Sequence, residues 1–336
     1  MKKLFIACAA FVWTIALVAQ NISVVNSDGS TKLYRTLQAA IEGADPNSVI
    51  YLPGGCFPIA DSVKITKKLT IIGIGHKAKN DNVDGVTTIS GNLFFNEGSS
   101  GSAVMACYIT GNVNIGEGGA SVNDVLIRYC NLNSVQVNNS TCQETVVNQN
   151  YIRNGSAFGN SSAKVTNNVI HSIAYIDGGT ISRNIITGYY QTVWSSTAYG
   201  DVFRIIEASN SFIGNNIMIG NGKSKYGSNA HVGGANNQII ENMSKESVGE
   251  ACVIINTDWS EVFNIYNGGA INPTSDFHFK DDYKQYENIV GIYADGVDFD
   301  KQLAPVPYIV AKKIDDQTDA SGKLNIKIRV KASGEE

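Results

Sequence analysis

Charged residues are scarce in this chain of 336 residues: Asp, Glu, Lys and Arg make up 17% of it, against roughly 25% in an average soluble protein. The formal net charge is −4. No basic stripe is present of the kind that proteins use to contact the phosphates of nucleic acid. We therefore expect no nucleic-acid partner.

Proline is absent from a long central stretch, since none of the six prolines lies between Ile59 and Asn272. A strand that is bonded on both edges cannot lose a backbone N–H group, and proline has none. The absence therefore favours a body of paired strands over residues 20–272, including an N-terminal cap. Residues 273–336 would form a connector and a strand module.

Cysteine motifs are absent too. Beyond the first nineteen residues no C-x-x-C pair and no Cys/His spacing suggests a metal site, and an odd number of cysteines cannot pair completely within one chain. We expect no metal and no evident cofactor, and calcium is possible only if the chain is a lyase. The five cysteines are Cys56, Cys107, Cys130, Cys142 and Cys252.

Long apolar runs are confined to the start, "MKKLFIACAAFVWTIALVAQ". Lys2 and Lys3 precede an apolar stretch, and the small Ala19 precedes Gln20, which is typical of a secretory signal. A membrane anchor is the alternative, but about 15 apolar residues are short for a span of ~20. We expect a signal peptide at residues 1–19, export to the cell envelope or the medium, and no membrane span in the mature chain.

The chain does contain a repeat: an apolar residue, two further residues, Asn or Cys, one residue and an apolar residue. Its irregular period of about 20 residues is typical of a solenoid. The segments are short and β-branched, and Gly, Asn and Ser separate them, so they are predicted to be strands. Strands that recur this way stack in parallel, which predicts an all-β fold, a single-stranded parallel β-helix. The central positions are Cys107, Cys130, Asn150, Asn168, Asn184, Asn216 and Asn242.

The repeated Asn is expected to stabilise a bend between two strands of a coil. Its side chain can point inward and bond to backbone groups and to the amides above and below it, which forms a ladder. Cys107 and Cys130 occupy the same slot, where a thiol is a small apolar filler. A disulfide between these two is the alternative to free thiols.

The two ends of a solenoid expose strand edges and need protection. "TLQAAIEGA" predicts a helix with Thr36 as its N-cap and Gly43 near its end, and its apolar face would hold Leu37, Ala40 and Ile41. "GKLNIKIRVKA" alternates apolar and polar residues, which predicts a half-buried strand. "KQLAPVPYI" predicts an extended connector.

The run from "LYRTLQAAIEGA" through "VIYLPGG" and "KLTIIGIGH" to the Asn-bearing coils resembles the pectin-lyase-like superfamily over roughly residues 30 to 270. The resemblance implies a right-handed β-helix. "VGIYADG", "APVPYI" and "GKLNIKIRVKA" resemble the closing module of bacterial secreted β-helix proteins without an assigned activity. The superfamily includes polysaccharide lyases, hydrolases and non-enzymatic surface proteins, so the fold does not decide the function. No catalytic residue of its enzymes can be carried over by motif.

Two long insertions mark a candidate binding surface. The step from Asn184 to Asn216 is 32 residues and the next is 26, and each insertion begins four residues after its ladder Asn, at Gly188 and Gly220. Both insertions should therefore project from one edge. Aromatic rings suit the apolar face of a sugar, and lysines suit an acidic one, although the aromatics could instead cover the solenoid. The candidates are Tyr189, Tyr190, Trp194, Tyr199, Lys223, Lys225 and Tyr226.

The candidates for catalysis are weaker. Arg153 and His171 would be neighbours on one outer face and could serve a lyase as cation and base, but a solvated face is the simpler interpretation. Asp201 and Glu207 are a carboxylate pair of the type that glycoside hydrolysis needs. Six residues along a strand are ~20 Å, however, which is too far for an acid/base pair.

We therefore expect an exported bacterial β-helix protein that contacts polysaccharide through aromatic loops near residues 189 to 231, with no evident catalysis. The first alternative is a polysaccharide lyase or glycoside hydrolase acting on an acidic glycan. The second is a structural or adhesive surface protein.

Overall fold

The computed structural model describes residues 21–61, 63–76, 86–192, 202–220, 232–267, 274–297, 299, 308–314, 323 and 326–331. Only the backbone is described for residues 190–192, 202–203 and 308–314, and for 326–331 apart from Lys327. The expected signal peptide at 1–19 lies outside the described residues, as do Pro305 and Pro307 of the expected connector.

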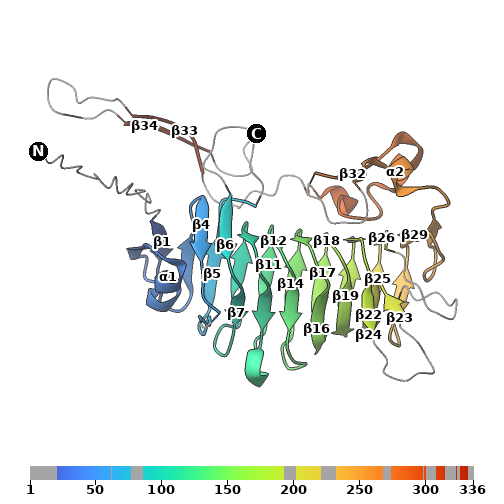
Figure 1. The fold of residues 1–336 in the computed structure, drawn as a ribbon, viewed down its shortest axis with the longest axis horizontal. Coiled ribbons are helices and arrows are strands. Elements are labelled where there is room, and N and C mark those ends of the chain that lie inside the picture. The colour runs from blue at the N-terminus through green and yellow to red at the C-terminus, as the bar shows by residue number, and fades with distance from the viewer. Residues whose placement is uncertain are drawn as a thin grey trace, which may run out of the picture.

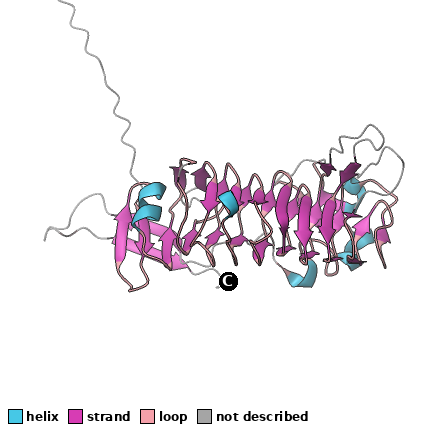
Figure 2. Ribbon diagram, turned by 90° about the horizontal axis from the view of Figure 1, so that it is seen from below, coloured by secondary structure: helices cyan, strands magenta, loops and turns pink. Residues whose placement is uncertain are grey.

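Three sheets run along the molecule, and almost all of their strands pair in parallel (Figures 1 and 2). Sheet A contains, in spatial order, β2 (Thr31–Tyr34), β1 (Ile22–Val25), β3 (Ser48–Tyr51), β5 (Leu69–Ile72), β8 (Ala103–Met105), β11 (Leu126–Arg128), β14 (Thr145–Asn148), β17 (Ala163–Thr166), β20 (Thr180–Ser182), β25 (Phe212–Gly214) and β28 (Gln238–Ile240). Only β1 is antiparallel to its neighbours β2 and β3 in this sheet.

Sheets B and C follow the same order along the molecule. Sheet B contains β4 (Gly55–Pro58), β6 (Thr87–Ser90), β9 (Tyr108–Ile109), β12 (Asn131–Leu132), β15 (Tyr151–Ile152), β18 (Val169–Ile170), β21 (Ile185–Ile186), β26 (Ile217–Met218), β29 (Met243–Ser244) and β30 (Val253–Ile254). Sheet C contains β7 (Leu93–Phe95), β10 (Val113–Ile115), β13 (Val135–Val137), β16 (Ser156–Ser161), β19 (Ile173–Asp177), β24 (Ile206–Ser209) and β27 (Val232–Gly233).

From β5 to β27, each turn of the chain contributes one short strand to each sheet. The chain passes through β14, β15 and β16 and then returns to sheet A as β17, which pairs in parallel with β14. The same apolar position recurs in every turn, so that Val147, Val165 and Ile181 are aligned and fully buried. The expected all-β stack of parallel strands is confirmed, and the inward residues form one continuous core.

The N-terminal end of this stack is covered by α1 (Leu37–Gly43), as Figure 2 shows. The Thr36 hydroxyl accepts a hydrogen bond from the backbone N–H of Ala39 (3.2 Å), which caps the helix. Leu37, Ala40 and Ile41 are buried and join the core cluster. The helix and its buried face agree with the sequence pattern.

The other end of the core is closed by a device that the sequence analysis missed. The loop after β29 inserts Val248, which is 6% exposed and belongs to the core cluster. The next residue, Gly249, has a φ of +75° and would place a Cβ against the Ile239 carbonyl. Only glycine fits this close approach without strain, so the loop closes the last coil without a helix.

The parallel body ends at β30, well before the expected limit at residue 272. The chain then folds back over the outer face of sheet B as a covering segment (residues 255–267, 274–297 and Phe299). This segment contains α2 (Trp259–Val262), the antiparallel pair β31 (Phe263–Ile265) and β32 (Asp276–Phe279), and the 3₁₀ turns η2 (Asp281–Tyr286) and η3 (Ala294–Gly296). Another 3₁₀ turn, η1 (Glu117–Gly119), lies within the body.

The covering segment is bonded to the body at the bends between sheets A and B. The side-chain amide of Asn167 donates to the Ile292 carbonyl (3.3 Å), and the N–H of Gly291 donates to the Asn215 carbonyl (2.8 Å). Arg183 forms an ion pair with Asp295. These bonds fix the segment over one half of sheet B (Figure 1).

The C-terminal module is a two-stranded antiparallel hairpin of β33 (Tyr308–Ile314) and β34 (Ile326–Lys331). The strand β34 lies within the segment that the alternating pattern predicted. The strand β33 was not expected, because "KQLAPVPYI" was interpreted as an extended connector through Ile309. The described pairing begins at Tyr308, directly after Pro307, which has no N–H group to donate.

Within the described part of the chain, no helix combines the length and the apolar character that crossing a bilayer requires.

Candidate functional site

The bends from sheet A to sheet B that carry the ladder residues share one backbone form. The residue before each ladder position has a positive φ, near +57° at Gln149, +55° at Asn167, +58° at Arg183 and +59° at Asn215. This left-handed conformation turns the next residue inward. Asn150, Asn168, Asn184, Asn216 and Asn242 are all fully buried.

The inward amides bond to one another along the solenoid. The Asn168 Nδ2 donates to the Val147 carbonyl (2.9 Å) and to the Asn184 Oδ1 (3.0 Å), which also accepts from the backbone N–H of Asn168 (3.0 Å). The same set of bonds recurs at Asn150, Asn184 and Asn216. Because every buried amide has partners, the bend is held firmly.

Cys107 and Cys130 extend this row as free, fully buried thiols. The N–H of Cys130 donates to the Asn150 Oδ1 (2.8 Å), so the ladder is continuous across the change of residue type. Burial raises the pKa of Cys107 well above its ordinary value and raises the pKa of Cys130 to about 12. These thiols stay protonated and act as core fillers, and the alternative disulfide is not formed.

Cys252 occupies the same bend position in the last coil, which the sequence analysis missed. The residue before it, Ala251, has a φ of +51°, and β30 begins directly after it. The spacing of only ten residues from Asn242 hid this copy.

The two long insertions leave the body at stacked glycines. The N–H of Gly188 donates to the His171 carbonyl (2.7 Å), and the N–H of Gly220 donates to the Ile186 carbonyl (3.2 Å). A Cβ on Gly188 would overlap the His171 ring, and a Cβ on Gly220 would overlap the Gly188 carbonyl. The roots of the insertions therefore lie directly on top of each other, on one flank of the solenoid.

The first insertion rises from this root as a hairpin of β22 (Tyr190–Thr192) and β23 (Val202–Arg204), which was not expected. Tyr189 at its base is 46% exposed, and its ring lies 6.4 Å from the ring of His171 at a 47° tilt. Burial lowers the pKa of His171. Tyr190 is described by its backbone alone, and Trp194, Tyr199, Asp201, Lys223, Lys225 and Tyr226 lie outside the described residues.

Arg153 and His171 are aligned in adjacent coils, but the Arg153 side chain turns toward the earlier coils, away from His171. Its guanidinium donates to the carbonyls of Ile109 (3.0 Å) and Thr110 (3.1 Å) and to the Asn131 side chain. It lies 5.0 Å from the centroid of the Tyr108 ring. The structure thus gives Arg153 a role in holding neighbouring coils together.

Glu207 is paired as well. It forms an ion pair with Arg204 on the same strand edge, and both side chains lie over Gly233, where a Cβ would overlap them. Asp201, the other member of the expected carboxylate pair, lies outside the described residues. Among the residues that the structure describes, no three of His, Cys, Asp and Glu gather as metal ligands would.

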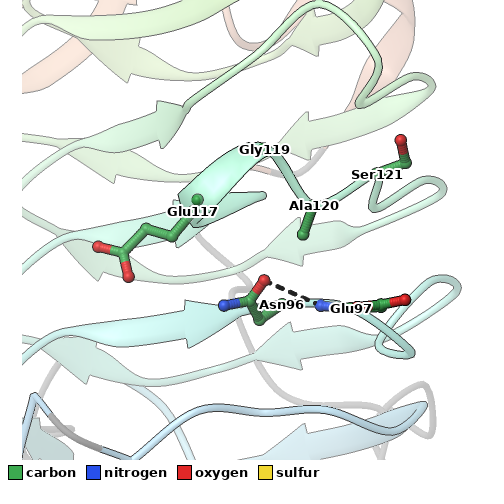
Figure 3. Close-up of a pocket in the computed structure, with 7 residues that line it drawn as sticks. Asn96, Glu97, Glu117, Gly119, Ala120 and Ser121 are labelled. Atoms are coloured by element: carbon green, nitrogen blue, oxygen red, sulfur yellow. Dashed lines mark hydrogen bonds between the residues drawn. The ribbon is translucent and has the colours of Figure 1, made fainter.

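A shallow polar hollow lies between two turns that lead from sheet C to sheet A (Figure 3). Asn96 and Glu97 come from one coil, and Glu117, the backbone of Gly118 and Gly119, Ala120 and Ser121 come from the next. The Glu117 carboxylate is bound by Lys64, whose Nζ also lies 3.7 Å from the centroid of the Phe94 ring. The hollow therefore offers no unengaged pair of carboxylates.

Comparison with known proteins found no family model, no curated protein and no solved structure that matches this chain.

Proposed function

We propose that this chain is an exported bacterial β-helix protein that contacts polysaccharide through the flank where the two insertions rise. We call this the insertion flank: residues 188–204 and 220–232. We further propose that a single chain winds right-handed coils, as the resemblance to the pectin-lyase-like superfamily implies.

The observation that carries the proposal is the stack of His171, Gly188 and Gly220. Because these residues lie directly on one another, the two insertions leave from adjacent points of the same edge. Tyr189 stands at this root with nearly half of its surface open to solvent. Rigid, half-exposed aromatics suit the apolar face of a pyranose ring, and their hydroxyl groups suit its polar rim.

The insertions supply further residues of the same chemical type. Tyr190, Trp194, Tyr199 and Tyr226 would extend the aromatic surface, and Lys223 and Lys225 would favour an acidic sugar. Catalysis is not part of the proposal, because Arg153 and Glu207, two of the four weak candidates for it, are engaged by other groups of the body.

Binding to a polysaccharide array by the mature chain tests the proposal. We expect weak affinity per site, on the order of micromolar to millimolar, and loss of binding in Tyr189→Ala and Trp194→Ala. A matched control is Tyr51→Ala, since Tyr51 is 37% exposed on the first coil of sheet A, far from the insertion flank in sequence.

Thermal unfolding separates contact from packing. A ligand-facing aromatic contributes little to the core, so Trp194→Ala should leave the unfolding temperature nearly unchanged. A large drop in that temperature, or equal binding by Tyr51→Ala and Trp194→Ala, would contradict the proposal. Release of shortened or unsaturated products from the array would instead favour the lyase or hydrolase alternative.

A further inference from the structure

A third apolar cluster lies outside the solenoid, on the outer face of sheet A. Ile72 is 7% exposed and Ala106 is fully buried, and Val49, Met105 and Tyr129 pack against them. Leu126 and Val146 continue the outward row of Val49, Thr70 and Ala103, whereas Ile72 and Met105 lie in the next outward row, which continues with Arg128. We call these residues the outer patch: Val49, Ile72, Met105, Leu126, Tyr129 and Val146.

The outer patch stops where sheet A becomes polar. The row that holds Leu126 and Val146 continues with Lys164 and then Thr180. All members of the cluster come from sheet A and its adjoining bends. On sheet B the comparable apolar area is buried beneath the covering segment. The outer patch on sheet A is thus an apolar surface that a second segment could bury.

The hairpin of β33 and β34 has the pattern that such a cover needs. Its register places Ile314 opposite Ile326 and Ile309 opposite Val330, on the face that also holds Ile328 and Lys312. The opposite face holds the pairs Lys313–Lys327, Ala311–Arg329 and Tyr308–Lys331. One face is therefore mainly aliphatic and the other is basic, since residues alternate between faces along β34 and a register shift between Ile309 and Ala311 places Ile309 opposite Val330.

This hairpin needs a partner, because a lone two-stranded hairpin is at best marginally stable in water. It forms a sheet of its own and pairs with no strand of sheets A, B or C. Figure 1 shows it above the N-terminal half of the solenoid, set off from the body and apart from α2 and β32. The outer patch lies in that same half.

The length of the chain permits the hairpin to reach the patch. Phe299 is fully buried, and its ring lies 5.1 Å from that of Tyr151, which shares a turn with Val146. The nine steps from Phe299 to Tyr308 can span about 30 Å. The patch extends four strand spacings from β14 back to β3, about 19 Å, and lies one bend away from Tyr151.

We propose that the aliphatic face of the β33–β34 hairpin packs on the outer patch, with its basic face toward solvent. The hairpin would then close sheet A as the covering segment closes sheet B. The proposal is independent of the proposed function, because neither the hairpin nor the outer patch belongs to the insertion flank.

Hydrogen exchange of the mature chain tests the proposal, with Leu126→Glu as the variant and Lys164→Glu as its control. Both changes put a carboxylate in the same outward row of sheet A, one inside the patch and one beyond it. We expect amides of residues 308–314 and 326–331 to exchange about tenfold faster in Leu126→Glu and at the wild-type rate in Lys164→Glu. Exchange in β11, β14 and β17 verifies that the body stays folded.

A reciprocal variant, Ile328→Lys, leaves the solenoid unaltered and should speed exchange in the hairpin to the same extent. If Leu126→Glu left hairpin exchange at the wild-type rate, the proposal would be overturned. Sedimentation identifies the rival occupant: a wild-type dimer that Leu126→Glu converts to monomer, with hairpin exchange unchanged, would assign the patch to a second copy of the chain.

Discussion

The two halves of the outer face of sheet B differ sharply, although both consist of equivalent short strands from successive turns. In the first half the outward row is polar or open, with Cys56, Thr88, Tyr108 and Asn131. In the second half it is apolar, and the covering segment buries it. The second half of the row holds Tyr151, Val169, Ile185, Ile217, Met243 and Val253.

This difference shows how a solenoid encodes its cover. The inward residues are apolar in both halves because the core runs the whole length of the body. The outward residues decide whether a strand faces water or protein, and strands that are buried on both faces have consecutive apolar residues. "Asn-Val-Ile" and "Asn-Ile-Ile" at residues 168–170 and 184–186 carry that signal, whereas "Cys-Asn-Leu" at 130–132 does not.

The largest expected effect comes from the outward row in the covered half. Ile185→Ala should destabilise the fold by about 2–5 kcal/mol, because it leaves a cavity beneath the covering segment. Ile185 is fully buried and belongs to the cluster of Val290 and Ile292. Chemical denaturation measures the change in the free energy of unfolding.

The control for Ile185→Ala is Thr88→Ala, in the same outward row but in the open half, where Thr88 is partly exposed. We expect a change within about 0.5 kcal/mol there. Similar losses for the two variants would mean that the two halves do not differ in the way that the outward row indicates.

The second effect tests what the two halves share. Asn168→Leu should cost about 1–3 kcal/mol, because the Asn150 side chain and the N–H of Asn150 lose the oxygen that accepts from both. Thermal unfolding followed by circular dichroism measures it. An unchanged melting temperature would show that the ladder does not stabilise the covered half. The two halves would then differ in how their bends are stabilised as well.

The sequence permitted prediction of features that depend on neighbouring residues. The ladder positions follow from the repeat spacing, and the cap helix follows from Thr36 and from the apolar positions Leu37, Ala40 and Ile41. The common root of the insertions follows from counting residues to Gly188 and Gly220. Each of these depends on a local pattern that recurs or on a cap within one turn of a helix.

Other features could not be predicted in this way. The covering segment consists of short elements without a period, and its partners lie far from it in sequence, such as Tyr151 and Phe299. The outward row of sheet B does not enter the repeat, because the repeat is defined only by inward residues. The pattern therefore did not predict the cover. The tips of the insertions are known from composition alone, so the proposed contacts of Trp194 and Tyr226 rest on residue type.

A third and smaller effect depends on pH and concerns only the covered half. Burial raises the pKa of Glu287, but the hydrogen bonds with Lys284 and His278 lower it by more. The net pKa is therefore below its ordinary value. A carboxyl group with a lowered pKa in the folded state stabilises the fold above its unfolded pKa and loses this contribution as pH falls through the folded pKa. Acid should therefore loosen the covering segment first.

Hydrogen exchange at decreasing pH, corrected for the intrinsic rate, measures this loosening. We expect protection in residues 276–292 to fall as the pH drops below about 4.5 while protection in β8 to β12 persists. Glu287→Gln should remove the pH dependence. Simultaneous loss of protection in both halves would mean that the acid response belongs to the body.

The smallest effect comes from the ion pair between Arg183 and Asp295, which joins the bend before Asn184 to the covering segment. Its side chains are 37% and 60% exposed, so solvent and salt screen the interaction, and such pairs contribute about 0–1 kcal/mol. Arg183→Gln should therefore lower the stability of the covering segment slightly, and the difference from the wild type should vanish in high salt. Arg128→Gln is the control, because Arg128 lies two residues before Cys130 in the open half and bonds to Gln149 within the body. If Arg183→Gln instead released the covering segment outright, as measured by proteolysis, polar contacts at the bends would hold the cover and the apolar outward row would be secondary.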